Sequence, residues 1–147
     1  MSLLGQEEAD RLLGLEKVPA NDDSYTFPFL SGKLAIDLIN HTEREEFILN
    51  YTQSKINLEK RNHQMRGQQV IILARLDLYG PPHRNPDGQE IGPCHMHLYR
   101  EGYGDKWAFP VPSERFQNLK DAYQTFLDFM RYCNVVEFPD VERSLFS

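Results

Sequence analysis

The feature that most restricts the fold is a run of short segments, from residue 24 onward, in which apolar and polar side chains alternate. Residues 34–39, 46–51 and 55–59 each show this period of two, which is typical of β-strands with one buried face. These segments follow one another too closely to leave room for crossover helices. Because parallel neighbours need such crossovers, the sequence predicts a mainly antiparallel sheet.

Two later segments extend this sheet. Residues 69–79, QVIILARLDLY, form the strongest strand pattern, since they are long, β-branched and apolar on both sides in their first half. Residues 95–99, HMHLY, alternate again. If the apolar side chains of both segments face the core, their polar side chains share the other side of the sheet. The side chains predicted to lie together there are Arg75, Asp77, Tyr79, His95, His97 and Tyr99.

Helical periodicity appears towards both ends of the chain. In residues 4–15, leucines recur at helical spacing, and acidic residues lie in the first turns, where they suit the helix dipole. Residues 118–132 carry a continuous apolar stripe, as an amphipathic helix does. Asn118 is the expected cap of this second helix. Residues 139–146 are expected to form a last short helix after a proline, and residues 107–109 one more strand.

Together these patterns predict an α+β fold. We expect a mainly antiparallel sheet of five or six strands, with an N-terminal helix and a C-terminal amphipathic helix packed on one face. A chain of 147 residues fits a single domain. Within it we expect an acidic helical segment over residues 1–23, the sheet over 24–112 and the C-terminal helices over 113–147.

The negative charge is concentrated at the start of the chain. Of a formal net charge of −6, residues 1–23 contribute −4, from six acidic and two basic side chains. The remainder is close to neutral and neither demands nor forbids a polyanionic partner. The longest apolar run is far shorter than the ~20 residues that span a bilayer, and the first segment lacks the pattern of a secretory signal. We therefore expect a cytoplasmic protein with no membrane contact, whose Cys94 and Cys133 are free thiols.

His95 and His97 lie two positions apart and so project from the same face of the predicted strand, with Cα atoms about 7 Å apart. This arrangement suits metal ligation if Asp77, His83 or Cys94 supplies a third ligand from the predicted hairpin. The spacing matches no zinc signature. The simpler interpretation is that the histidines only pair with Asp77 or Tyr99 on a solvated face, so no cofactor is predicted.

The same two histidines also fit general acid–base catalysis, because histidine titrates near neutral pH. With Arg75 or Arg100 to neutralise a phosphate and Tyr79 or Tyr99 to orient it, the face has the components of a metal-free ribonuclease or phosphodiesterase. Such sets of residues also occur on ordinary binding surfaces. The candidate catalytic residues are His95, His97, His83 and Arg75.

A loop rich in proline and glycine connects the two strands over residues 80–93. Its motif Asn-Pro-Asp-Gly predicts a turn, since proline presets one dihedral angle and glycine accommodates the reversal. The loop is longer than a usual hairpin connection, and loops of this length often have a function. His83 and Arg84, at its start, are therefore candidate binding residues.

A basic stretch with only Glu59 opposing it occupies residues 55–66. Its members are Lys55, Lys60, Arg61, His63 and Arg66. The stretch suits contact with a phosphate backbone, and nearby aromatic residues would then offer stacking surfaces. Basic residues are equally common on solvated sheet edges, where they prevent aggregation. The full set of candidate binding residues is Asp77, Tyr79, His83, Arg84, Tyr99, Arg100, Lys60, Arg61 and Arg66.

Several of these motifs resemble those of a family of small uncharacterised bacterial and prophage proteins. They are RLDL at residues 75–78, PPHRNPDG at 81–88, HMHLYREGYGDKWA at 95–108 and FMRYCN at 129–134. The similarity extends from about residue 24 to the end. It implies a cytosolic accessory protein of mobile elements and supplies no catalytic residues.

Since no motif completes an active site, the sequence favours a non-enzymatic binding module. Its polar sheet face and proline-rich loop would recognise a protein or a nucleic acid. The alternatives are a metal-free ribonuclease or phosphodiesterase that uses His95 and His97, and a metal-dependent hydrolase. The oligomeric state is left open, and a homo-oligomer is compatible with the sequence.

Overall fold

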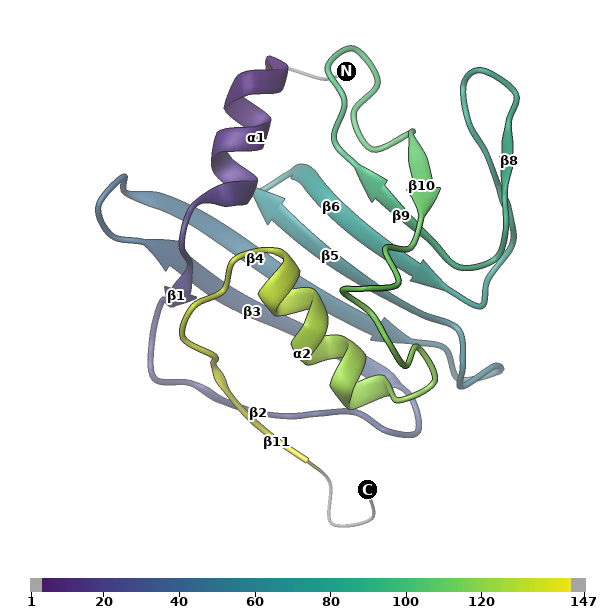
Figure 1. Ribbon diagram of the computed structural model, residues 1–147. Helices are drawn as coiled ribbons and strands as arrows, with labels where there is room; N and C mark the ends of the chain where they lie inside the picture. Colours follow the sequence, from purple (N-terminus) through teal and green to yellow (C-terminus); the bar gives the residue numbers. More distant parts are fainter. Residues whose placement is uncertain (1–3, 144–147) are drawn as a thin grey trace.

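The computed structural model describes residues 4–143 and has a seven-stranded antiparallel sheet as its main element (Figure 1). The strands lie in the order β1-β3-β4-β5-β6-β9-β10, so the long strands are neighbours both in sequence and in space. Their bounds are β1 Val18–Pro19, β3 Gly32–Asn40, β4 Glu45–Gln53, β5 Arg61–Gly67, β6 Ile71–Leu78, β9 His95–Leu98 and β10 Ala108–Pro110. Short connections between successive strands produce this antiparallel order.

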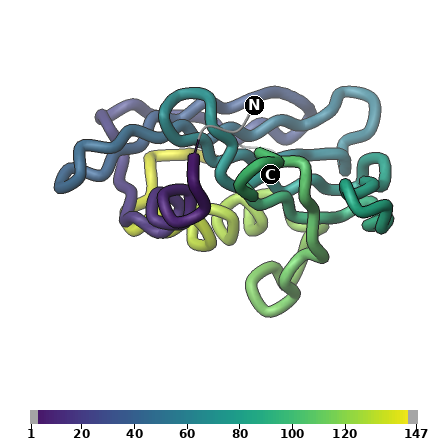
Figure 2. The backbone as a smooth tube through the Cα atoms, turned by 90° about the horizontal axis from the view of Figure 1, so that it is seen from above, coloured from purple at the N-terminus to yellow at the C-terminus, as the bar shows by residue number. Residues whose placement is uncertain are grey.

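Two helices and two small strand pairs complete the described part of the fold. Both helices lie against the same side of the large sheet, as Figures 1 and 2 show from two directions. We call this side the covered face and the opposite side the open face. The remaining bounds are α1 Gln6–Gly14, α2 Ala122–Tyr132, the parallel pair β2 Ser24–Thr26 and β11 Asp140–Glu142, and the antiparallel pair β7 His83–Arg84 and β8 Glu90–Ile91.

The hydrophobic core lies between the covered face and the helices. Every second side chain is buried along most of β3 and β4, as the alternating pattern predicts. Aromatic rings of α2 pack directly on the sheet: the ring centroid of Phe126 lies 5.8 Å from that of Tyr51, and the centroid of Phe129 lies 5.4 Å from that of His63. Burial of these large rings supplies much of the driving force for docking the helix.

Lys17 links the ends of the two helices. Its ammonium group donates to the carbonyl oxygens of Leu13, Leu15 and Cys133 at 2.7, 2.9 and 2.8 Å. The residue is 0% exposed and its Nζ lies 4.6 Å from the centre of the Phe47 ring. Burial lowers the pKa of Lys17 to about 8. The three acceptors match the three protons of the ammonium, so this charge is buried with all its hydrogen bonds made.

The α+β class and the large antiparallel sheet are confirmed, but the sheet has seven strands rather than five or six. The strand predicted at residues 55–59 is wrong, because this segment is a loop in which Ile56 and Leu58 are exposed. The strand that follows is β5. Its buried side chains include Arg61 and His63, so apolar alternation does not reveal it.

Two expectations near the C-terminus are also corrected. The second helix is capped by Asp121 rather than by Asn118, because the Asp121 carboxylate accepts a hydrogen bond from the backbone N–H of Gln124. The short helix predicted over residues 139–146 is wrong where the structure describes it, since strand β11 pairs there with β2. Residues 144–147 lie outside the described part. A pairing with so distant a segment has no local sequence signal.

Candidate functional site

The register of β6 and β9 brings together four of the predicted polar side chains. Arg75 lies opposite His97, and Asp77 lies opposite His95, so all four project from the open face. The same register continues through β5 and β4 and forms two rows of polar side chains across the sheet. One row is Thr52, Asn62, Asp77 and His95; the other is Asn50, Gln64, Arg75 and His97.

Asp77, His95 and His97 converge at one end of these rows, and we call them the histidine cluster. Oδ2 of Asp77 lies 3.4 Å from Nε2 of His95 and 3.3 Å from Nε2 of His97. One ligand atom from each residue lies within 4.8 Å of the others. The side chains of His95 and His97 are only 3% and 1% exposed, whereas that of Asp77 is 26% exposed. The cluster is therefore reached by solvent mainly at its carboxylate.

Backbone carbonyl groups determine which nitrogen of each ring carries the proton. Nδ1 of His95 lies 2.7 Å from the oxygen of Gly92, and Nδ1 of His97 lies 2.8 Å from the oxygen of Asp105. A carbonyl oxygen can only accept, so each Nδ1 must donate. In the neutral rings, both Nε2 atoms are then lone-pair acceptors that face the Asp77 carboxylate.

Arg75 connects the cluster to a second carboxylate. Its Nη1 donates to Oδ2 of Asp105 at 2.6 Å, its Nε lies 3.2 Å from Oδ1 of Asp77, and its Nη2 donates to Nε2 of His97 at 3.0 Å. One guanidinium against two carboxylates leaves a net charge of −1 while both rings are neutral. The lone pair on Nε2 of His95 faces a carboxylate oxygen, which is also an acceptor.

The Asp77 carboxylate is ionised in this environment. Burial alone would raise the pKa of Asp77, but a hydrogen bond donated by His97 in its protonated form and the charge of Arg75 hold it below its ordinary value. The site therefore holds a negative charge that still accepts a further cation or proton.

The proline-rich loop reaches the cluster through His83 and is attached to the sheet by Asn85. Nε2 of His83 donates to the carbonyl oxygen of Lys106 at 2.7 Å, and the His83 ring centroid lies 4.6 Å from that of His97. The buried Asn85 donates from Nδ2 to the Ala108 oxygen at 2.9 Å and accepts from the Ala108 N–H at 2.8 Å. Asn85 thus pairs with β10 as another strand would.

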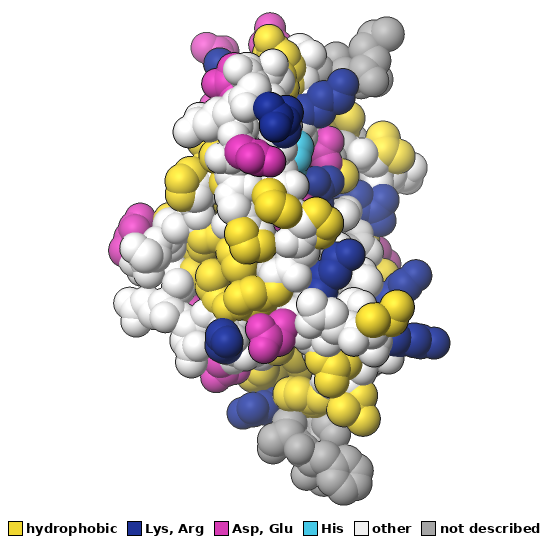
Figure 3. Space-filling model, turned by 90° about the vertical axis from the view of Figure 1, so that its right-hand side faces the viewer, with side chains coloured by type: hydrophobic (Ala, Val, Ile, Leu, Met, Phe, Trp, Pro, Cys, Tyr) yellow, Lys and Arg dark blue, Asp and Glu magenta, His cyan; other side chains and the backbone are white. Residues whose placement is uncertain are grey.

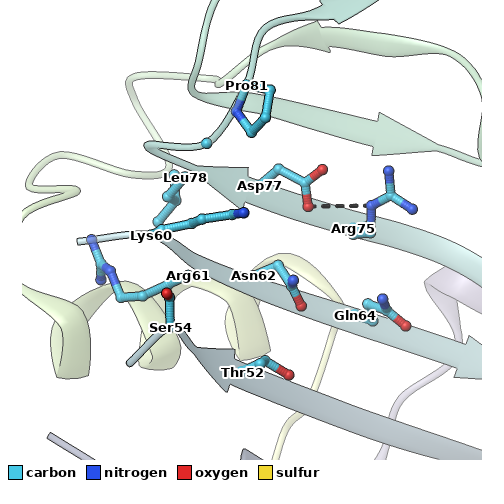
Figure 4. Close-up of a pocket in the computed structure, with 11 residues that line it drawn as sticks. Thr52, Ser54, Lys60, Arg61, Asn62, Gln64, Arg75, Asp77, Leu78 and Pro81 are labelled. Atoms are coloured by element: carbon cyan, nitrogen blue, oxygen red, sulfur yellow. Dashed lines mark ion pairs between the residues drawn. The ribbon is translucent and has the colours of Figure 1, made fainter. Parts of the chain in front are cut away.

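A cleft of about 360 Å³ opens on the open face beside the cluster (Figure 4). In Figure 4 the side chain of Lys60 extends over the cleft toward Asp77, and Asn62 and Gln64 lie along its floor. Figure 3 shows that lysine and arginine side chains gather on the right of that view, the side of the open face. The residues that line the cleft are Thr52, Ser54, Lys60, Arg61, Asn62, Gln64, Arg75, Asp77, Leu78, Gly80 and Pro81.

The two tyrosines predicted to share the open face do not lie there. β9 ends at Leu98, and Tyr99 is buried in the core, where its hydroxyl donates to the Leu4 oxygen at 2.7 Å. Tyr79 follows the end of β6 with a φ of 56° and packs against the core. The alternation argument holds within each strand and fails one residue beyond it, because the backbone direction changes there.

The predicted basic stretch does not form one surface. His63 and Arg61 are 0% and 3% exposed and point toward the covered face, where Arg61 donates to the Leu119 oxygen. Lys60 is exposed at the cleft. Arg66 lies on the open face and donates to Oδ1 of Asn50 at 2.9 Å. The stretch is divided because alternate residues of β5 face opposite sides of the sheet.

The other predicted site residues lie apart from the cleft and the cluster. Arg84 is exposed, with its guanidinium 3.9 Å from Glu90, and the Arg100 guanidinium lies 4.4 Å from the centre of the Trp107 ring. Cys94 is half-buried and is not a member of the histidine cluster.

Sequence reasoning missed four residues of the site: Asp105, which anchors Arg75; Asn85, which holds the loop; and Asn62 and Gln64 in the cleft. Asn85 and Asp105 could have been found from the sequence, since they lie in the motifs at residues 81–88 and 95–108. Asn62 and Gln64 could have been found only by assigning β5 correctly.

The fold and the site define an α+β protein with a polar cleft beside a buried histidine and aspartate cluster. The chain belongs to a family described as "Family of unknown function (DUF6978)", which matches residues 4–135. The predicted resemblance to an uncharacterised family is thereby confirmed, but the match begins at residue 4 rather than at about residue 24 and ends at residue 135. No curated protein and no solved structure matches the chain significantly. Within residues 4–143, no helix is long and apolar enough to cross a membrane.

Proposed function

We propose that the protein is a binding module whose ligand carries a phosphate group and lies in the cleft on the open face. The chemistry of the cleft walls supports this proposal. Lys60, Arg75, Asn62 and Gln64 all bring hydrogen-bond donors to the space, and Asp77 is the one carboxylate among the described residues that line it. Phosphate oxygens accept hydrogen bonds and carry negative charge, so they match a wall of this kind.

The size of the cleft and its surroundings favour a small ligand. Its volume of about 360 Å³ falls within the range of roughly 300–1,000 Å³ that small-molecule sites occupy. Beyond the cleft, the open face mixes Lys33 and Arg66 with the acidic Asp37 and Glu46. A long nucleic acid needs a continuous basic track. A nucleotide, or the end of a nucleic-acid strand, therefore fits this face better than a long strand.

The geometry favours binding over metal-free cleavage by two histidines. The rings of His95 and His97 have centroids 4.8 Å apart, are nearly inaccessible and face the same carboxylate. A histidine that transfers a proton must come within hydrogen-bond distance of the reacting group. A phosphate in the cleft meets Lys60 and Arg75 before it meets either ring.

The proposal is tested by titrating the purified full chain, in the presence of EDTA, with AMP and with a fluorescein-labelled trinucleotide. Lys60→Ala is expected to weaken binding about tenfold, because it removes one charge-assisted contact of about 1.4 kcal/mol. Added salt is expected to weaken binding of the wild type as well. The matched control is Lys120→Ala, since Lys120 is an exposed lysine that does not line the cleft. The proposal is wrong if neither probe binds, or if both variants weaken binding equally.

A further inference from the structure

We propose that Asp77, His95 and His97 form a binding site for one divalent transition-metal ion. This inference does not depend on the ligand proposed for the cleft. Two imidazole nitrogens and one carboxylate oxygen converge within 4.8 Å of one another from two adjacent strands. Two histidines with one carboxylate are a common donor set of zinc and non-haem iron sites that keep open coordination positions.

The hydrogen bonds behind the two rings are those expected of metal ligands. A histidine that binds a metal through one nitrogen usually donates from the other to a carbonyl or carboxylate, which fixes the ring and its tautomer. Here Nδ1 of His95 donates to the Gly92 oxygen and Nδ1 of His97 donates to the Asp105 oxygen. Both Nε2 lone pairs are thereby directed to the point that they share with Asp77.

The charges at the site also call for a cation. With neutral histidines, Arg75 balances only one of the two carboxylates of Asp77 and Asp105. The Nε2 atom of His95 lies 3.4 Å from the Asp77 oxygen, and when the ring is neutral both atoms are acceptors. A divalent ion bound between them converts this repulsive contact into two bonds and neutralises the excess negative charge.

Metal binding requires Arg75 to give up its hydrogen bond to His97. Its Nη2 donates to Nε2 of His97 at 3.0 Å and so uses the lone pair that the ion needs. The same guanidinium is held by Asp105 at 2.6 Å through Nη1. This second anchor keeps Arg75 at the site after the contact with His97 is lost. The positive charge then remains beside the cleft, where Asp77 is the exposed member of the cluster.

The test uses the full chain, stripped with EDTA and freed of chelator, and isothermal titration with Zn²⁺. Co²⁺ binding followed by its visible absorption gives a second readout that reports the ligand geometry. We expect one Zn²⁺ per chain, with affinity at least about 100-fold lower in His95→Ala and in Asp77→Asn. The matched control is His41→Ala, because His41 is exposed in the turn between β3 and β4; this variant is expected to bind as the wild type does.

The outcomes separate the two proposals. Absence of Zn²⁺ binding by the wild type overturns the metal site, and so does equal binding by wild type, Asp77→Asn and His95→Ala. Asp77→Asn preserves side-chain shape, so it decides the question if His95→Ala fails to fold. Because nucleotide binding is measured in EDTA and metal binding without nucleotide, either proposal can fail while the other stands.

Discussion

Lys17 on the covered face and the histidine cluster on the open face are both buried ionisable groups, but their hydrogen-bonding atoms are satisfied in different ways. On the covered face, each proton of the Lys17 ammonium has a carbonyl acceptor at 2.7–2.9 Å. On the open face, Nε2 of His95 faces the carboxylate of Asp77 at 3.4 Å. A buried group with every hydrogen bond made stabilises one structure, whereas the proposed metal site depends on acceptors that converge on one point.

His63 shows that convergence, and not burial alone, marks such a site. It is a third buried histidine with an environment of aromatic rings from Tyr51, Phe126 and Phe129. Burial lowers the pKa of His63 to about 3, so the ring is neutral at physiological pH. It lies on the covered face and is not part of the histidine cluster. His63 therefore contributes to the packing of the core. Unlike His95 and His97, it does not converge with another metal-ligating side chain in the described part of the chain.

The largest expected effect is on the covered face. Lys17→Ala removes the donor for three carbonyl oxygens and leaves a cavity under the helix ends, so we expect a loss of about 4 kcal/mol in the free energy of unfolding. Urea denaturation at pH 7 measures this loss. The control is Lys120→Ala, because Lys120 is exposed; this substitution is expected to change the free energy of unfolding by less than about 0.5 kcal/mol. A loss below about 1 kcal/mol for Lys17→Ala would remove the distinction between the two faces.

A fall in pH sharpens the comparison through His63. The pKa of His63 is about 3 in the folded chain and about 6.5 in the unfolded chain. Below pH 6.5 the ring is therefore protonated in the unfolded chain but stays neutral in the folded chain. Stability contributed by the neutral ring is complete above that pH and declines by about 1.4 kcal/mol per pH unit below it. Between pH 6.5 and 4.5 this amounts to at most about 2.7 kcal/mol.

The control for this pH effect is His63→Phe, which keeps an aromatic ring in the same place and removes the titrating group. Urea unfolding curves of both proteins across this range, in EDTA, measure the difference. The variant is expected to lose less stability than the wild type as the pH falls. Parallel curves would show that His63 is protonated in the folded chain, contrary to its burial.

A smaller effect is expected where the proline-rich loop meets the open face. Asn85→Ala removes two hydrogen bonds to Ala108 and leaves a buried N–H and C=O without their partner, which costs about 2 kcal/mol. Amide hydrogen exchange is expected to rise mainly in residues 80–94, since the helices pack on the other face. Asn57→Ala, in the exposed loop before β5, is the control. Uniformly faster exchange throughout the chain would mean that the loop is integral to the core.

The grouping of Arg75, Asp77, His95 and His97 was predictable because the period of a strand is two and both strands carry a clear apolar set. Tyr79 and Tyr99 were misplaced because each lies one residue beyond its strand, where that period no longer applies. The boundary itself depends on tertiary contacts. The hydroxyl of Tyr99, for example, bonds to Leu4 at the other end of the chain.

β5 was missed for a different physical reason. Its inward-facing residues include Arg61 and His63, which a hydrophobicity pattern counts as outward. They are tolerated there because Arg61 donates to the Leu119 oxygen near α2 and the His63 ring packs among aromatic rings. The polar floor of the cleft, Asn62 and Gln64, was missed with this strand.

The amino-acid sequence by itself determined the α+β class, the antiparallel pairing and the side of the sheet on which His95 and His97 lie. These depend on local periodicity and on connection length, both of which are properties of neighbouring residues. Only the tertiary structure decided that the rings of His95 and His97 share one carboxylate, that each ring donates from its other nitrogen to a backbone carbonyl, and that a cleft opens beside them. Such features depend on ångström-scale distances between segments far apart in the chain, which residue order does not specify locally.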